Sequence, residues 1–205
     1  MTSGVAHEGL SKALIQAAEA EIAENGIGAV SLRAIARRVG VSHQAPGHFF
    51  RDRSGLLTAL AVDGFHRLIA HMTNTRQALP SDASVADQMT AVGVAYITFA
   101  DQQPAVFSLM MRPELHNQDD QELVRARVAC YSVLLETVAS ARAEGWGRGH
   151  SDEQLAMASW ALVHGAVTLW QGGDLAIFYP DSSIEEVARH VTGVLASALA
   201  ASPSG

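Results

Sequence analysis

The sequence lacks the cysteines and the signal peptide that are typical of secreted, disulfide-bonded proteins. It has a single cysteine, Cys130, so no disulfide can form within the chain, and it has no start that resembles a signal peptide. These absences predict a protein of the reducing cytoplasm. Cys130 lies in an apolar run, which favours a small core residue over a nucleophile.

Membrane-spanning runs and strand patterns are also missing. The stretch from Gln154 to Gly173 carries no charge, but its apolar part runs only from Leu155 to Trp170 and is interrupted by polar residues and glycine. Crossing a bilayer takes about twenty apolar residues, so we expect a buried helix there and no membrane partner. No segment alternates apolar and polar residues as a strand does, and the expected fold class is therefore all-α.

The sequence shows no arrangement of residues that would carry catalysis or bind a metal. His43 with His48 and His66 with His71 are each five residues apart, whereas metal ligands on one helix face are typically four apart. The glycine-rich segment 145–149 follows a helix instead of a strand, so it is interpreted as a turn and not as a phosphate-binding loop. We expect no enzyme, no metal site and no cofactor.

What the chain does contain is a succession of helix patterns separated by turn-forming residues. Its 205 residues and 48% hydrophobic content suit a small head joined to a larger helical body. The expected helices are 7–25, 31–39, 43–50, 54–73, 85–102, 104–111, 120–144, 152–171 and 184–201. The stretches 113–119, 145–151 and 172–183 are expected to be turns.

The most informative segment is SLRAIARRVGVSHQAPGHFF, residues 31–50. Ser31 can cap a first helix, Gly40 suits a reversal that needs positive φ, and Ser42 stands where a second helix would take its cap. The outward-pointing polar residues of that second helix are expected at His43, Gln44 and His48. Two short helices around such a turn are typical of a helix-turn-helix, whose second helix enters the major groove of DNA.

Positive charge is concentrated in this part of the chain. Residues 31–53 contain five arginines and one aspartate, a local charge of +4, which leaves −11 for the rest of a chain whose total is −7. Such a contrast attracts DNA phosphates to one part of an otherwise acidic protein. The alternative is that this segment is one helical hairpin among several, and that its arginines only make the water-exposed face of the hairpin polar. The charge distribution favours DNA binding.

The order of these motifs resembles the TetR (tetracycline-repressor-like) family of transcriptional regulators. The resemblance is most specific over about residues 8–62, where ENGIGAVSL, RAIARRVGVS and HFFRDRSGLL follow one another. In the body, AYITFADQQPAVFSLMMRPEL and WALVHGAVTLWQGG resemble one subgroup with a Trp-x-x-x-His-Gly pattern, formed here by Trp160, His164 and Gly165. The family implies a three-helix DNA-binding head, expected at residues 1–53, and a helical ligand-binding and dimerization body at 54–205.

The resemblance also implies roles for single residues of the head. Ser31 matches a hydroxyl residue that contacts phosphate, and Arg53 stands where the family usually has a lysine that holds the DNA backbone. The candidate DNA-binding residues are Ser31, Arg33, Ser42, His43, Gln44, Ala45, Gly47, His48 and Arg53. Gly47 departs from the family, which most often has a tyrosine there whose ring packs and whose hydroxyl touches phosphate.

For the body, the family implies a homodimer and a small-molecule effector. The dimer is expected to form through residues 152–171 and 184–201, and the apolar stripe of the last helix supports it, with packing inside the chain as the alternative. The candidate ligand-binding residues are Met89, Tyr96, Phe99, Phe107, Met110, Trp160, His164 and Trp170. Each of them has a place in the core as its alternative.

Together these patterns predict a repressor that binds a palindromic DNA operator as a dimer and is released by an unidentified small molecule. The alternative is a small-molecule-binding helical protein of the same fold with weak or lost DNA recognition. Gly47 is the residue that favours this alternative.

Overall fold

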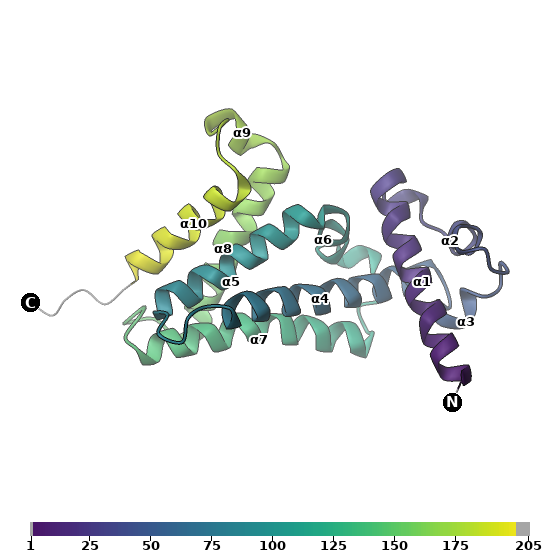
Figure 1. The fold of residues 1–205 in the computed structure, drawn as a ribbon, viewed down its shortest axis with the longest axis horizontal. Coiled ribbons are helices and arrows are strands. Elements are labelled where there is room, and N and C mark those ends of the chain that lie inside the picture. Colours follow the sequence, from purple (N-terminus) through teal and green to yellow (C-terminus); the bar gives the residue numbers. More distant parts are fainter. Residues whose placement is uncertain (1, 200–205) are drawn as a thin grey trace, which may run out of the picture. The chain divides into compact units, whose positions relative to one another are not determined.

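The computed structural model describes residues 2–199, and the side chains of residues 7–199. All regular secondary structure in this part of the chain is helical (Figure 1), which confirms the all-α fold class. The longer helices are α1 (Thr2–Asn25), α2 (Leu32–Val39), α4 (Arg53–Gln77), α5 (Val85–Gln102), α7 (Gln121–Ala143), α8 (Asp152–Gln171) and α10 (Ile184–Ala198). The shorter ones are α3 (Gly47–Phe50), α6 (Pro104–Met110), α9 (Asp174–Phe178) and the 3-10 turns η1 (Ile27–Ala29) and η2 (Pro113–Leu115). None of the described helices is both long and apolar enough to cross a membrane.

Two compact units make up the chain. The head unit combines the chain up to His66 with Gln103–Arg127, and the body unit combines Arg67–Gln102 with the chain from Val128 onward. Helices α4 and α7 therefore each contribute to both units. This division follows packing, whereas the boundary expected after residue 53 divides the chain by function, and that boundary stays a prediction.

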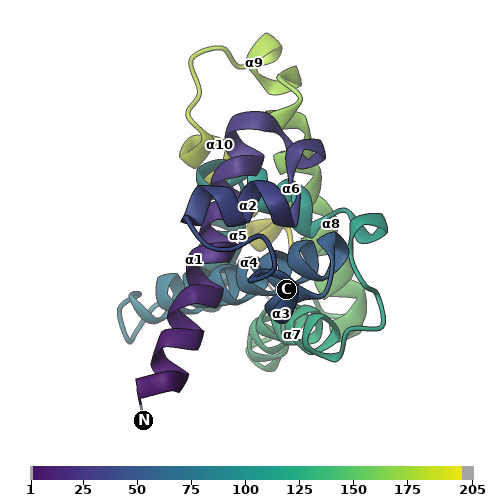
Figure 2. The same ribbon diagram turned by 90° about the vertical axis from the view of Figure 1, so that its right-hand side faces the viewer.

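In the head unit, α2 packs against α1 (Figure 2) and begins and ends as its sequence predicts. The Ser31 hydroxyl oxygen accepts a hydrogen bond from the Ala34 amide at 3.2 Å, which caps the start of the helix. Gly40 ends it in the left-handed conformation, with φ of 78°. Ile35 and Ala36 are fully buried between these ends.

The second helix of the expected pair is shorter than predicted. Only Gly47–Phe50 is α-helical, and residues 43–46 form turns. Pro46 is the reason, because it has no amide proton for a helical bond to the Ser42 carbonyl and disfavours a helical conformation of Ala45. The Ala45 amide bonds to the Ser42 carbonyl instead, at 3.0 Å. The prediction of a helix over 43–50 capped by Ser42 is therefore wrong, since α3 starts after Pro46 without a side-chain cap.

Other expectations also fail, and one of them is the end of the helix expected at 54–73, since α4 runs on to Gln77. Helix α4 begins at Arg53 because the Asp52 carboxylate accepts the Gly55 amide at 2.8 Å, so Asp52 and not Ser54 caps this helix. The stretch 172–183 was expected to hold only turns, but it includes α9. By contrast, α5 and α8 have the predicted bounds, and the last residues of the helix expected at 184–201 lie outside the described part of the chain.

The body unit is built around α5, which packs against both α8 and α10 (Figure 1). The approach to α10 is close, because a Cβ placed on Gly93 of α5 would lie 2.5 Å from the Thr192 methyl group. Serines with reciprocal glutamine or glutamate partners cap both α8 and α10. The buried Trp146 indole donates to the Ala196 carbonyl at 3.0 Å, which fastens the turn after α7 to the end of α10.

The sharp bend between α3 and α4 generates a prediction at Gly55. Arg51 has φ of 61°, and the Phe50 carbonyl, which accepts the Asp52 amide, lies 1.9 Å from where a Gly55 Cβ would be. We expect Gly55→Ala to lower the free energy of unfolding by about 1–3 kcal/mol through this overlap. Gly9→Ala, whose added Cβ meets nothing within 4 Å, is the control, and it should raise that free energy by up to about 1 kcal/mol. Urea denaturation measures the free energy of unfolding of both variants. If that of Gly55→Ala equalled that of the wild type, the close approach of the Phe50 carbonyl to Gly55 would be contradicted.

Candidate functional site

The candidate DNA-binding residues of the head lie at the start of α2, on the turn that leads into α3, on α3 itself and at the first residue of α4. Seven are exposed to solvent: Ser31, Arg33, Ser42, His43, Gln44, Gly47 and His48. Ala45 is half-buried beneath them. A Cβ on Gly47 would meet nothing within 4 Å, so packing does not explain the missing side chain at this position. The structure thus presents a short polar segment to solvent, with no side chain at the first residue of α3.

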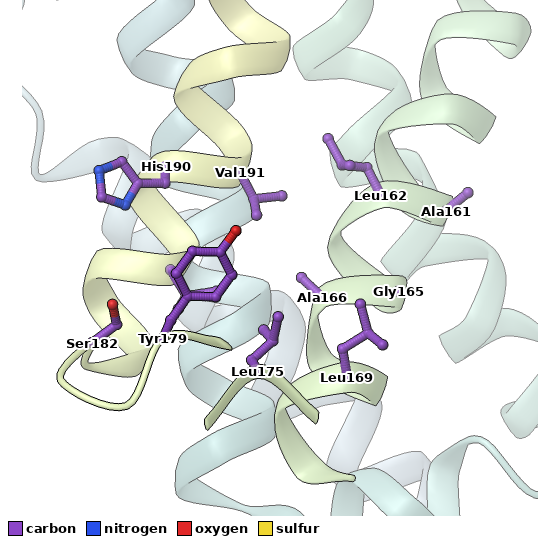
Figure 3. A pocket seen from close by; sticks show the side chains of 11 residues that line it. Ala161, Leu162, Gly165, Ala166, Leu169, Leu175, Tyr179, Ser182, His190 and Val191 are labelled. Atoms are coloured by element: carbon purple, nitrogen blue, oxygen red, sulfur yellow. The ribbon is translucent and has the colours of Figure 1, made fainter. Parts of the chain in front are cut away.

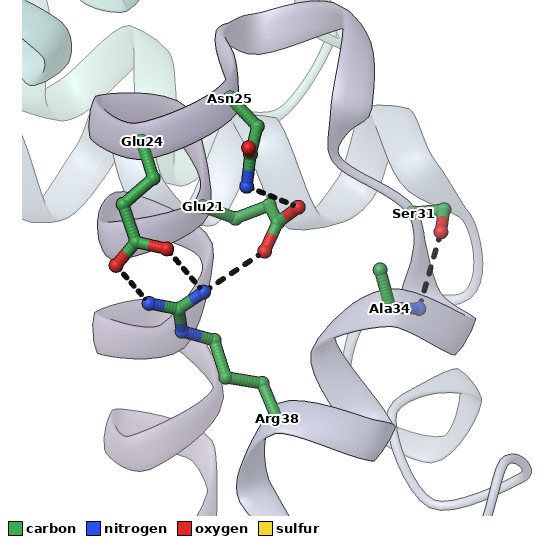
Figure 4. A network of polar contacts seen from close by, with 6 residues as sticks. All are labelled: Glu21, Glu24, Asn25, Ser31, Ala34 and Arg38. Atoms are coloured by element: carbon green, nitrogen blue, oxygen red, sulfur yellow. Dashed lines mark hydrogen bonds and ion pairs between the residues drawn. The ribbon is translucent and has the colours of Figure 1, made fainter.

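Arg38 of α2 is engaged inside the head unit (Figure 4). Its guanidinium forms ion pairs with Glu21, at 3.1 Å, and with Glu24, both on α1. Asn25 in turn donates to Glu21 at 3.0 Å. The hydrogen bond from Arg38 lowers the pKa of Glu24 below its ordinary value. This network ties α2 to α1 and largely cancels the charge that Arg38 would offer to a phosphate.

Arg53 is also bonded within the protein. Its Nε donates to the Val30 carbonyl at 2.8 Å and its Nη2 donates to the Ile27 carbonyl at 2.7 Å, and the side chain is half-buried. Its contact with the DNA backbone stays a prediction. Within residues 7–199, no hydrogen bond or ion pair engages the side chains of Arg33 and Arg37, which are both exposed. Arg37 was not among the predicted residues, although it shares the exposed side of the same amphipathic helix.

Arg51 faces a different environment. It lines a polar groove of about 700 Å³ in the head unit, formed by α1, α4 and the start of α7. Four acidic residues line the same groove, namely Asp52, Asp63, Asp120 and Glu122. Carboxylates repel phosphate, so this groove is unsuited to the DNA backbone. We therefore do not count Arg51 among the cations available to DNA.

In the body unit, the structure brings three candidate ligand-binding residues together. The Tyr96 oxygen of α5 lies 3.0 Å from His164 Nδ1, and the Trp160 indole donates to the Tyr96 oxygen at 3.3 Å. The Tyr96 oxygen accepts the Trp160 proton and also shares a hydrogen bond with Nδ1, in which the donor depends on the tautomer of His164. Burial lowers the pKa of His164 and raises the pKa of Tyr96.

The other candidates are dispersed. Met89 lies in a core cluster with Val138, Trp146 and Leu155. Phe107 and Met110 are buried in the head unit. Phe99 lies beside His71, with ring centroids 6.3 Å apart, and the Trp170 indole donates to Asp101 at 2.8 Å. The candidates therefore do not form one continuous site within either unit.

Cys130 was predicted to be a small core residue, but it is only half-buried and does not belong to the buried core. Burial raises the pKa of its thiol to about 12, so the nucleophilic thiolate is suppressed. Among the described residues, no group of three or more histidine, cysteine, aspartate or glutamate side chains is placed to hold a metal ion.

An apolar pocket that the sequence did not predict lies between α8 and α10 (Figure 3). It has a volume of about 510 Å³, and Leu175 of α9 and Tyr179 after it close one end. The lining residues are Ala161, Leu162, Gly165, Ala166, Leu169, Leu175, Tyr179, Ser182, Val187, His190 and Val191. None of the candidate ligand-binding residues lines it. The pocket depends on the segment after α8, which was expected to be only a turn.

The low pKa of His164 generates a prediction about stability. Burial holds the folded-state pKa below the ordinary value of 6.5, so in acid the unfolded chain binds more protons than the folded one. Stability is therefore expected to fall as the pH drops below about 6.5 and to be unaffected by this group above it. The variant His164→Asn keeps an acceptor for Tyr96 but cannot be protonated. Its free energy of unfolding, measured with urea, should therefore fall less than that of the wild type between about pH 7.5 and about pH 5.5. An equal loss in both proteins would contradict this role.

Comparison with known proteins finds family models and solved structures that are similar to this chain. A family model described as the tetracyclin repressor-like C-terminal domain matches residues 89–200, and one described as bacterial regulatory proteins of the tetR family matches residues 14–60. A protein of unknown function from Rhodococcus sp. RHA1 is 30% identical, with 94% of this chain and 96% of that chain covered and a TM-score of 0.82.

Two further structures share the fold at lower identity. The TetR family regulator PfmR from Thermus thermophilus is 17% identical over 90% of this chain and 97% of that chain, with a TM-score of 0.65. The regulator FadR from Bacillus subtilis, in complex with stearoyl-CoA, is 17% identical over 91% and 97%, with a TM-score of 0.71. The Trp-x-x-x-His-Gly subgroup stays a prediction. Because one family model matches more than half of the chain, the protein belongs to the TetR family of bacterial transcription regulators, as its motifs predict, and is not an enzyme.

Proposed function

We propose that this chain is a ligand-responsive repressor that binds a palindromic operator as a dimer and leaves it when a small molecule binds. Regulators of this family bind DNA and act as dimers with small-molecule effectors. The observation that carries the proposal is the exposed polar segment from Ser42 to His48, next to the exposed Arg33 and Arg37, in a chain that is otherwise acidic. Phosphate attraction and hydrogen bonding to bases are thereby combined in one part of the head unit.

The exposed polar residues of α2 and of this segment have chemistries that suit their proposed contacts. The Ser31 hydroxyl accepts from the Ala34 amide, and its own proton can be donated to a phosphate at the start of α2. Arg33 and Arg37 supply charge for the DNA backbone. The polar side chains proposed to reach base edges are Ser42, His43, Gln44 and His48. Ala45 and Gly47 can contribute only a methyl group and backbone.

A second candidate function is a small-molecule-binding protein of this fold with weak or lost DNA recognition. Two observations favour it. Gly47 leaves open space where the family usually has a tyrosine, and α3 is a single turn of four residues. Both features reduce the rigid surface that the head unit can offer to a major groove.

A binding experiment separates the two functions. The wild-type protein is used to select duplexes from a random-sequence pool, and its affinity for the selected duplex and for a scrambled duplex is then measured over a series of salt concentrations. The repressor function predicts a preference for the selected duplex at every salt concentration. It also predicts that log K, where K is the association constant for DNA, falls linearly with log[salt]. Equal binding to both duplexes even at low salt would overturn it and support the second candidate.

The dimer is proposed to form through α8 and α10. Large apolar side chains on these two helices are exposed, with Met157 at 61%, Leu169 at 46% and Val194 at 70% of their full accessible surface. Such side chains are normally covered in a stable protein when they gather on one face, and the apolar pocket of Figure 3 lies between the same helices. A dimer with two-fold symmetry would present two head units to the two halves of a palindrome.

Val194→Asp tests this interface. A carboxylate there would have to be desolvated in the dimer, so we expect the variant to be a monomer at micromolar concentrations at which the wild type is a dimer. Val128→Asp, on α7 and 60% exposed in the wild type, is the control and should stay dimeric. Size-exclusion chromatography with light scattering gives the masses. A monomeric wild type, or a fully dimeric Val194→Asp, would refute the interface.

The effector is proposed to bind the body unit near Tyr96, Trp160 and His164. These three side chains combine aromatic surface with a hydrogen-bonded polar chain, a combination that suits a small molecule with an apolar part and one polar group. Phe99 lies on the same helix as Tyr96. If the effector binds better to the conformation that DNA binds less well, DNA must weaken effector binding by the same factor.

A further inference from the structure

Arg53 makes an internal contact that gives it a different role from a phosphate clamp. Its two hydrogen bonds reach carbonyl groups 23 and 26 residues earlier in the chain. Ile27 begins η1, and Val30 directly precedes Ser31, the cap of α2. The first residue of α4 is thus joined to the backbone that sets where α2 begins.

The geometry of this contact requires the guanidinium group. The Ile27 carbonyl already accepts the Val30 amide at 3.3 Å, and Arg53 adds a second donor to it while its Nε bonds to the Val30 carbonyl. Arginine holds these two N–H groups in one rigid plane. Lysine carries the same charge on a single flexible ammonium and cannot reproduce this fork.

The surroundings of Arg53 also distinguish it from the exposed arginines of α2. Its side chain is half-buried and directs two of its donors at the protein, whereas Arg33 is exposed and has no bonded partner within residues 7–199. A cation that contacts phosphate through a flexible side chain can be replaced by lysine at little cost. A cation that holds two backbone carbonyls cannot.

We infer that Arg53 is a positioning residue, which holds the Ile27–Val30 backbone and with it the register of Ser31 and α2 on the DNA. This inference rests on the proposed DNA-binding function. The contacts of the head with the DNA backbone are then made by Ser31 and the exposed arginines of α2. At position 53, the shape of the arginine side chain is needed as well as its charge.

The test compares lysine and glutamine at two positions. Arg53→Lys, Arg53→Gln, Arg33→Lys and Arg33→Gln are titrated with the duplex selected by the wild-type protein and with its scrambled form, over a salt series. Stoichiometric titration gives the active fraction, so that each dissociation constant refers to folded protein. Circular dichroism reports the helix content of each variant.

At Arg33 we expect lysine to bind like the wild type. We expect glutamine to make the slope of log K against log[salt] less steep by about 1.8, because the dimer loses one phosphate contact in each of its two subunits. At Arg53 we expect lysine and glutamine each to weaken binding to the selected duplex by about tenfold, as loss of a hydrogen bond of typical net strength would. The preference for the selected over the scrambled duplex should fall as well, because a displaced α2 loses specific contacts first. The slope of Arg53→Lys should equal that of the wild type.

Three results overturn the inference in different ways. If Arg53→Lys binds like the wild type while Arg53→Gln makes the slope less steep by about 1.8, one contact for each subunit of the dimer, Arg53 is a phosphate clamp. If both Arg53 variants lose active fraction but their folded molecules keep the wild-type dissociation constant and preference, its role is only structural. If the wild type itself selects no duplex, the proposed function fails and the inference falls with it, which the first step of the experiment shows separately.

Discussion

The head unit depends on one constraint: the helices that carry its candidate DNA-binding residues are too short to be stable alone. Helix α2 has eight residues and α3 has four, whereas isolated helices below about 12–15 residues are marginal in water. Their position must therefore be fixed by contacts to longer neighbours. Arg38 supplies such a contact from α2 to α1, and Arg53 supplies one from α4 to the backbone before α2.

This constraint divides the basic residues of the head by their surroundings. Arg38, which is exposed, and Arg53, which is half-buried, are bonded within the head and stabilise the arrangement of its short elements, while Arg33 and Arg37 are exposed without such partners among residues 7–199. Arg51 lies in a groove with four carboxylates. The formal charge of +4 over residues 31–53 thus overstates what a phosphate would meet, since the attraction comes mainly from the exposed arginines of α2.

The sequence predicted what depends on local signals. Ser31, Gly40 and the apolar positions between them determined α2, and α5 and α8 were found with their bounds because caps and helical periodicity are local properties. The extent of α3 was wrong because the helix expected at 43–50 includes Pro46, whose missing amide delays the start of the helix. Side-chain contacts were beyond prediction, since the carbonyl partners of Arg53 and the contact of Tyr96 with His164 join residues far apart in the chain. The apolar pocket between α8 and α10 was missed for the same reason.

We propose that the head and body together make a regulator whose DNA binding responds to a small molecule. A genome-wide map of the sites bound by the protein, repeated with a panel of metabolites, tests this claim most directly. We expect a small set of discrete sites that share an inverted repeat, with occupancy lost in the presence of at least one metabolite. A map without enriched sites in cells that express the protein would contradict the claim.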